Sequence, residues 1–201
     1  NANVEEKMAL PPPMKPLHEV ARSLRNRPIT SEALALQALT RMADGNGEGS
    51  RTFVKVYRES ALERARATDR LGLGAPGRSI LTGIPVSIKD LFDVAGESTS
   101  AGSRALRDAK PANADAEAVR RLRMAGAVIV GRTNMSEFAY SAVGTNPHFG
   151  TPRNPFDRTE GRIPGGSSSG AAVSVTDGMA TVAIGSGTCR GGAPPPRPGP
   201  G

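Results

Sequence analysis

Apolar and polar positions along the chain predict an alternation of helices and strands. Two amphipathic helices are predicted from residue 17 onward, the second in TSEALALQALTRMA with Thr30 or Ser31 as its N-cap. TFVKVY alternates apolar and polar residues as a strand does, and RESALERARATDRL has the 3.6-residue period of an exposed helix. No internal repeat interrupts this order, so the pattern predicts a packed α/β protein.

The middle of the chain strengthens this prediction. GIPVSIKDLFDVAG contains a short apolar strand that ends at Lys89 and Asp90, and DAEAVRRLRMAGAVIVGRTN predicts a helix that begins near Asp115, a turn at Gly126 and a strand in AVIVG. A helix followed by a strand is typical of an α/β sheet. The irregular segment from YSAVGTN to GGSSSG is long enough to be functional, and AAVSVTDGMATVAIGS after it predicts a helix or a pair of strands.

Composition and charge narrow the class of protein. A chain of 201 residues can bury a sizeable core, here built from Ala, Val, Leu and Ile because only 3% of residues are aromatic. The net charge of +7 comes from basic residues interleaved with acidic ones, which favours a solvated surface over a nucleic-acid partner. Cys189 is the single cysteine and no long apolar run occurs, so we expect a cytoplasmic protein with no membrane partner.

Several kinds of active site do not fit the residues present. His18, His148 and Cys189 are isolated in the sequence, so we expect no metal and no cofactor. A Gly-x-Ser-x-Gly elbow is absent, and GRIPGGSSSG lacks the Gly-Lys-Ser/Thr ending of a phosphate loop. The remaining candidates for an active site are Lys89, at the end of a strand, and the serines at 167–169. Taken alone, a lysine after a strand is more often a surface residue and GGSSSG more often a linker, but the flanking RIP and AAVSV argue against a linker.

Four motifs in order resemble the amidase signature family. They are GIPVSIKDLFDVAG, AGAVIVGRTNMSEFAYS, NPHFGTPRNPFD and above all GRIPGGSSSGAAVSV, and the likeness covers roughly residues 83–184. The resemblance implies an α/β fold with a mixed sheet flanked by helices, of which this chain holds the front part and is incomplete. We therefore divide the chain into a flexible arm (1–16), an N-terminal helical region (17–82), a partial amidase core (83–184) and an aberrant Gly/Pro/Arg-rich tail (185–201).

The same resemblance implies roles for individual residues. The family hydrolyses or transfers amides with a Ser-Ser-Lys triad, in which Lys89 would be the base, its pKa lowered by burial. Ser167 would be the bridging serine that relays the proton, preceded by a cis peptide bond, and Ser168 would support the same hydrogen-bond network. A small-molecule amide is the implied substrate, and full-length members can form a homodimer.

The third triad member is missing from the position where the family places it. The nucleophilic serine follows the bridging serine by 24 positions, which here is Gly191. Cys189 and Arg190 replace glycines whose N–H groups would form the oxyanion hole, so we expect the chain as given to be inactive. The abrupt change to Gly, Pro and Arg suggests a shifted reading frame or a sequence error in residues 185–201. The alternative is a natural variant in which Cys189 is the nucleophile.

Three functions follow from these observations. The first is an amidase that acts through an acyl-enzyme, and the second is the A subunit of a glutamine-dependent tRNA amidotransferase, which would need partner subunits. DLFDVAGESTSAGS favours the general amidase branch over that second function. The third is a non-catalytic protein that uses its basic surface for binding.

Overall fold

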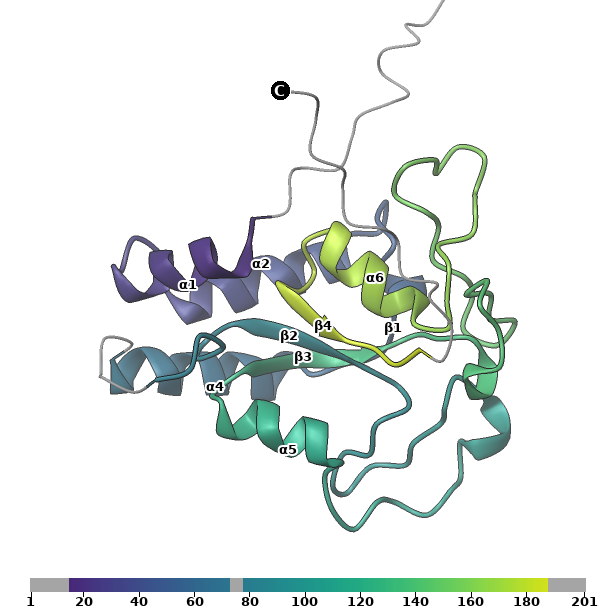
Figure 1. Ribbon diagram of the computed structural model, residues 1–201, viewed down its shortest axis with the longest axis horizontal. Helices are drawn as coiled ribbons and strands as arrows, with labels where there is room; N and C mark the ends of the chain where they lie inside the picture. Colours follow the sequence, from purple (N-terminus) through teal and green to yellow (C-terminus); the bar gives the residue numbers. More distant parts are fainter. Residues whose placement is uncertain (1–14, 73–77, 188–201) are drawn as a thin grey trace, which may run out of the picture.

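A mixed four-stranded sheet with helices on both faces forms the centre of the molecule (Figure 1). The structure is a computed structural model, and it describes residues 15–72 and 78–187. The elements in chain order are α1 (Leu17–Arg25), α2 (Ser31–Ala43), α3 (Gly49–Thr52), β1 (Phe53–Val56), α4 (Arg58–Leu71), β2 (Pro85–Lys89), η2 (Arg104–Leu106), α5 (Glu117–Met124), β3 (Val128–Thr133), η3 (Glu137–Ala139), α6 (Ser169–Thr176) and β4 (Val182–Ile184).

The strands lie in the order β1-β3-β2-β4. β3 pairs antiparallel with β1 and parallel with β2, and β2 pairs parallel with β4. Every residue of the two central strands is buried, as expected for strands covered on both faces. The expected mixed sheet flanked by helices is thus confirmed. Its central strands are short segments rich in valine and isoleucine.

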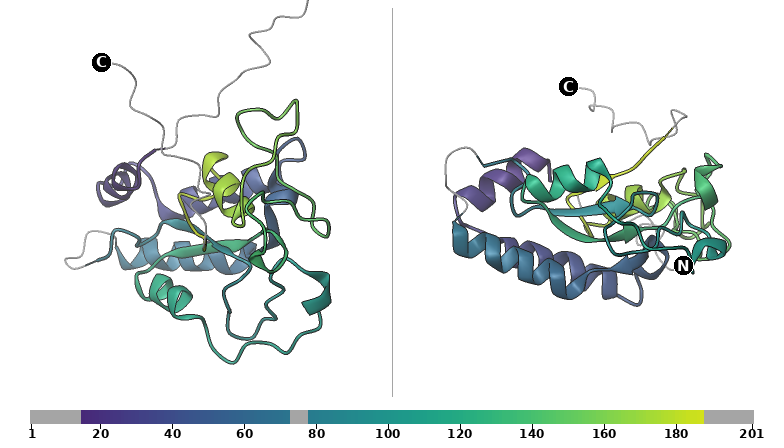
Figure 2. Two further views of the ribbon diagram at one scale, coloured as in Figure 1. Left: turned by 45° about the vertical axis from the view of Figure 1, so that its right-hand side comes forward. Right: turned by 90° about the horizontal axis from the view of Figure 1, so that it is seen from below.

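Two layers of helices cover the two faces of this sheet (Figures 1 and 2). On one face α1 and α5 pack against a cluster that includes Leu24, Val86 and Val119. On the other face α2, α4 and α6 pack against a cluster that includes Leu39, Ala65 and Val173. The alanines at the contacts of α2 and α4 let these helices approach each other and the sheet closely. In the described ranges no helix is long and apolar enough to cross a membrane.

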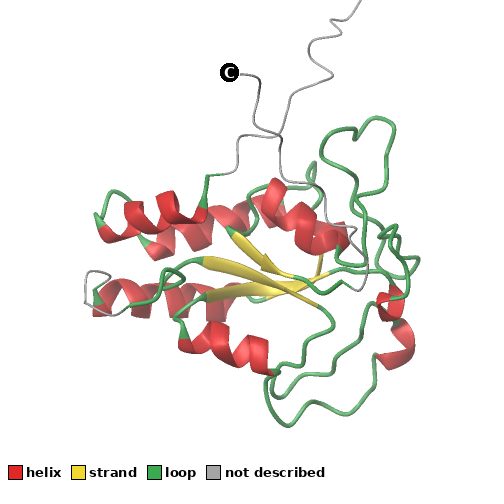
Figure 3. Ribbon diagram, viewed as in Figure 1, coloured by secondary structure: helices red, strands yellow, loops and turns green. Residues whose placement is uncertain are grey.

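Residues 140–168 contain neither helix nor strand and form the long loops drawn in green in Figure 3. Buried polar side chains hold this segment in place. The Glu48 carboxylate accepts hydrogen bonds from the backbone N–H of Arg153 at 2.9 Å and from its Nε at 2.7 Å. The Asn146 amide donates to the carbonyls of Gly102 at 2.8 Å and Met135 at 2.7 Å. The loop is therefore anchored to the helical layer and to the ends of the strands.

Most of the predicted elements are present, with differences in detail. Of the two predicted N-caps of α2, the structure has Thr30 and not Ser31, and the Thr30 side chain accepts a hydrogen bond from the N–H of Ala33 at 3.1 Å. α5 begins at Glu117, close to the predicted start at Asp115, and the Asp115 carboxylate accepts from the N–H of Ala95 and pairs with Arg123. The segment after GGSSSG is a helix followed by a strand, and the one-turn helix α3 was not predicted.

The packed face of α2 generates a stability prediction. Leu39 is 1% exposed in the core cluster, whereas Leu36 on the same helix is 47% exposed. We expect Leu39→Ala to lower the free energy of unfolding by about 2 to 5 kcal/mol through lost burial and a residual cavity. The matched control Leu36→Ala should change it by less than about 0.5 kcal/mol. Urea unfolding followed by circular dichroism measures both, and equal losses would contradict the assigned orientation of α2.

Candidate active site

Lys89 is the last residue of β2 and lies on the face of the sheet that α6 covers. Alternate residues of a strand share a face, so Lys89 follows Ser87 on the same side. The Ser87 hydroxyl is hydrogen-bonded to that of Ser174 in α6 at 2.8 Å. Because Ser174 itself donates to the carbonyl of Ala171, Ser87 is the donor in this pair. This contact fixes α6 over the strand and sets the N-terminus of the helix beside the lysine.

The Lys89 ammonium is fully buried and has three oxygen partners. Nζ lies 2.6 Å from Ser167 Oγ, 2.9 Å from Ser186 Oγ and 3.2 Å from the carbonyl oxygen of Ser186. An ammonium group has three N–H donors, so each donor can meet one acceptor. The structure thus brings together Lys89 and Ser167, two residues that the sequence separates by 78 positions.

The turn before α6 presents Ser167 to the lysine. The Gly166–Ser167 peptide bond is cis, and the N–H of Ser136 donates to the carbonyl of Ser167 at 2.9 Å. Two glycines allow the backbone to pass close by. A Cβ atom on Gly166 would lie 2.5 Å from the backbone N of Gly144, and a Cβ on Gly144, whose φ is +83°, would overlap the carbonyl oxygen of Gly165. Side chains cannot replace either hydrogen without moving this turn.

Ser168 and Ser186 form a reciprocal pair that connects the turn to the end of β4. The Ser168 hydroxyl donates to the carbonyl of Ser186 at 2.8 Å and accepts from its N–H at 3.1 Å. Ser168 thus contacts the backbone of Ser186 rather than the lysine. Sequence reasoning did not select Ser186, although it closes the AIGS segment where the family motif begins. Its proximity to Lys89 comes from the parallel pairing of β2 with β4.

Burial lowers the pKa of Lys89 from 10.5 to about 8. Removing an ammonium group from water disfavours its charged form, and the two hydroxyl groups beside it carry no charge that would offset this penalty. The neutral amine thus becomes accessible near neutral pH. A neutral Nζ has a lone pair that can accept the Ser167 hydroxyl proton across the 2.6 Å contact, so the pair can move a proton.

The other sequence candidates lie elsewhere or are not described. His148 Nε2 is 2.8 Å from Glu137 Oε1, which also accepts from the Ser103 hydroxyl at 2.6 Å. This arrangement places the carboxylate between hydroxyl and imidazole, so it is not the order of a serine–histidine–acid triad. Cys189, Arg190 and Gly191, on which the missing nucleophile was argued, lie outside the described residues, as do residues 1–14 of the expected arm.

Comparison with known proteins supports the same family. The Amidase family model matches residues 35–191. The chain is 44% identical over 171 residues to the A subunit of glutamyl-tRNA(Gln) amidotransferase from Azoarcus sp., covering 85% of this chain and 34% of that protein. It is 42% identical over 170 residues to the putative amidase AmiA2 of Mycobacterium bovis, with the same coverage. The chain thus spans about a third of the length of these relatives.

A solved structure extends the likeness to three dimensions. The native peptide amidase from Stenotrophomonas maltophilia superposes with a TM-score of 0.71 at 37% identity, over 84% of this chain and 35% of that one. Sequence and fold therefore agree over the region that carries the lysine, the serine turn and the four-stranded sheet. A match that covers most of the chain, together with this structural likeness, shows that the chain belongs to the amidase signature family.

Proposed function

We propose that the site around Lys89 is the proton-handling part of an amidase that cleaves carboxylic amides. The 2.6 Å contact between Lys89 Nζ and Ser167 Oγ is the observation that carries the proposal. A buried lysine beside a hydroxyl, with its pKa lowered to about 8, has the properties of a general base near neutral pH. Family membership supplies the reaction class, and a small-molecule amide is the proposed substrate.

In this proposal each residue has a defined task. Neutral Lys89 accepts the proton of the Ser167 hydroxyl, and Ser167 in turn accepts the proton of an attacking hydroxyl. That hydroxyl forms a bond to the carbonyl carbon of the amide, and the proton held by Lys89 returns through Ser167 to the leaving amine. Ser168 has a supporting role, because it fixes the backbone of Ser186 and hence one partner of the ammonium.

The chain as given does not supply the attacking hydroxyl at the position that the family motif implies. Gly191 stands there, and Cys189 and Arg190 stand where glycine N–H groups would bind the developing oxyanion. Removing a nucleophile from such a set of residues abolishes nearly all of its chemistry. We therefore propose that this polypeptide retains the base and the relay but does not turn over amides, and that it is a cytoplasmic protein.

The alternative is the A subunit of a tRNA amidotransferase. The 44% identity to the Azoarcus protein favours it, since that protein is named for this role. The putative amidase AmiA2 is 42% identical over the same span, so the identities alone do not separate the two branches. A non-catalytic nucleic-acid binder has less support, because on α5 Arg120 and Arg121 pair with Glu117 and Arg123 pairs with Asp115.

A serine-directed fluorophosphonate probe tests the loss of the nucleophile. We expect no covalent labelling of this chain at any serine, because Ser167 hydrogen-bonds the lysine and no serine occupies position 191. Intact-mass spectrometry measures the adduct, and a full-length amidase relative treated in parallel shows that the probe is reactive. An adduct on Ser167, Ser168 or Ser186 would sink the proposal.

The titration of Lys89 tests its role as the base. We expect its pKa to be about 8 instead of 10.5, so the neutral amine predominates above pH 8. The unfolded chain would bind more protons than the folded one between pH 8 and 10.5, so stability should rise with pH in that window. Carbon NMR of lysines labelled at Cε measures the pKa, and Lys89→Met assigns the signal. A Lys89 signal that titrates at the ordinary lysine value would contradict a base role.

Affinity purification separates the two enzymatic branches. If the chain belongs to an amidotransferase, tagged protein expressed in its native cell should recover the partner subunits at equal stoichiometry. The amidase proposal predicts that these subunits are absent. Mass spectrometry of the eluate identifies the proteins recovered. An unrelated tagged domain of similar charge is the control for proteins that bind nonspecifically through charge.

A further inference from the structure

Asp90, the residue after Lys89, is buried in a separate polar network. Its side chain is 3% exposed, and its Oδ2 accepts a hydrogen bond from the Ser100 hydroxyl and one from the N–H of Gly102 at 3.1 Å. The backbone is also fixed at this point, because the N–H of Asp90 donates to Thr133 at 3.1 Å and its carbonyl accepts from Ala101 at 3.0 Å. A buried carboxylate therefore lies one residue beyond the lysine.

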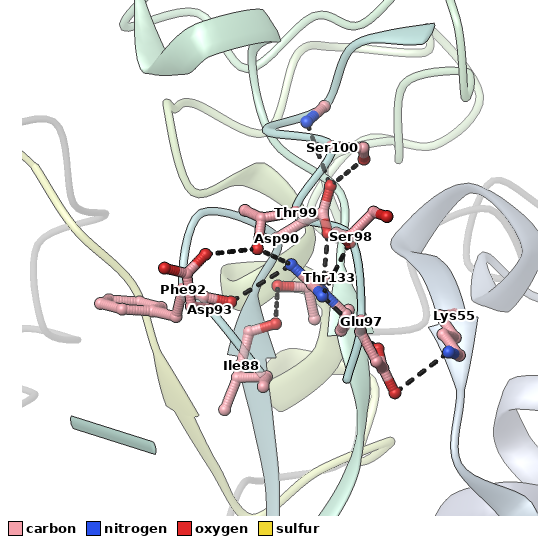
Figure 4. A network of polar contacts seen from close by, with 12 residues as sticks. Lys55, Ile88, Asp90, Phe92, Asp93, Glu97, Ser98, Thr99, Ser100 and Thr133 are labelled. Atoms are coloured by element: carbon pink, nitrogen blue, oxygen red, sulfur yellow. Dashed lines mark hydrogen bonds and ion pairs between the residues drawn. The ribbon is translucent and has the colours of Figure 1, made fainter. Parts of the chain in front are cut away.

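Arg132, in β3, supplies the opposite charge. Its side chain is 2% exposed, and its Nε lies 2.7 Å from Asp90 Oδ1 in an ionic contact that is not aligned as a hydrogen bond. Its terminal nitrogens donate to the loop that follows β2, at 3.2 Å to each of three acceptors: the carbonyls of Phe92 and Ser98 and the hydroxyl of Thr99. One guanidinium group thus binds the carboxylate and the loop that leaves the lysine strand. Figure 4 labels the partners Asp90, Phe92, Ser98 and Thr99.

The network extends outward to Glu97 and is balanced in charge. Glu97 Oε2 lies 3.4 Å from an Arg132 nitrogen, while Oε1 lies 3.0 Å from Lys55 Nζ, and the Tyr57 hydroxyl donates to Glu97 at 2.7 Å. Burial raises the pKa of Glu97, but the bonds from Tyr57 and Lys55 and the charge of Arg132 outweigh it, so the net shift is downward. Two anions, Asp90 and Glu97, therefore face two cations, Arg132 and Lys55.

The balance of charge between Asp90 and Arg132 bears on the pKa of Lys89, because the effect of a neighbouring charge depends on its sign. A carboxylate close to a lysine favours the ammonium form and raises its pKa, which works against the effect of burial. From the serine turn and from the end of β4, the groups that reach Nζ are the uncharged Ser167 and Ser186. Asp90 follows Lys89 directly in the chain and is paired with Arg132 of β3, and burial is what lowers the Lys89 pKa, so the pairing leaves the effect of burial unopposed.

We propose that Arg132 is a positioning residue that neutralises Asp90 and clamps the loop after β2, so that Lys89 stays beside Ser167 as a neutral base. This rests on the proposed function of Lys89. Without the guanidinium group, the Asp90 charge acts on Lys89 unopposed and the fraction of neutral amine at neutral pH falls. Arg132 pairs with Asp90, whose side chain leaves β2 on the opposite face from Lys89, so Arg132 acts on the lysine through its charge and through the strand end rather than on the substrate.

The test is the pKa of Lys89 in charge variants, read from the Cε signal of labelled lysines. Arg132→Gln should raise the Lys89 pKa by about one unit, the size expected for a nearby unit charge that is no longer opposed. Asp90→Asn should lower it, because Arg132 then acts alone. The double variant should return it toward the parent value. Arg132→Lys keeps the charge but loses the planar fork, so it should leave the Lys89 pKa unchanged while lowering the thermal midpoint.

Arg123 provides a matched control for Arg132. Arg123→Gln removes an arginine of the exposed pair with Asp115 and should leave the Lys89 pKa unchanged. The proposal is overturned if folded Arg132→Gln titrates like the parent, or if Arg123→Gln shifts Lys89 by as much. If Arg132→Gln does not fold, Asp90→Asn serves as the test in its place. An unchanged Lys89 pKa in that variant would also overturn the proposal. Because titration and not turnover is measured, an inactive chain leaves this result readable.

Discussion

The buried ammonium group of Lys89 is the constraint on which the rest of the structure depends. A charged nitrogen removed from water is costly unless its donors are satisfied, and here three oxygens from two separate segments surround it. Those oxygens belong to the turn before α6 and to the segment after β4. The lysine can therefore be buried only when the helix, the turn and the parallel pairing of β2 with β4 are all formed.

The end of β2 contributes to two separate polar networks because side chains alternate between the two faces of a strand. Lys89 and Asp90 are neighbours at the end of β2, and successive side chains of a strand point to opposite faces. The lysine meets uncharged hydroxyl groups, whereas the carboxylate meets a guanidinium group. An unopposed anion close to a lysine works against the lowering of its pKa by burial, so placing the two side chains on opposite faces and pairing the acid allows a base and an acid to be adjacent.

Close backbone approach is the second requirement of the site. Gly144 and Gly166 let the long loop and the serine turn touch, where a Cβ atom on either would overlap the backbone of the other segment. Buried polar anchors such as Glu48 and Asn146 then fix a loop that has no regular secondary structure. The family likeness to a peptide amidase covers this arrangement, although the chain spans only about a third of its relatives.

The sequence by itself determined most of the helices and strands and pointed to the lysine and serines of the site. Periodicity predicted an α/β protein, because the alternation of apolar positions is a property of neighbouring residues. The resemblance to the amidase signature family implied the mixed sheet flanked by helices and the roles of Lys89, Ser167 and Ser168. It did not predict Ser186 as a partner of the lysine or Arg132 as the partner of Asp90. Those contacts join residues 97 and 42 positions apart, and strand order and loop packing decide them, which no local pattern encodes.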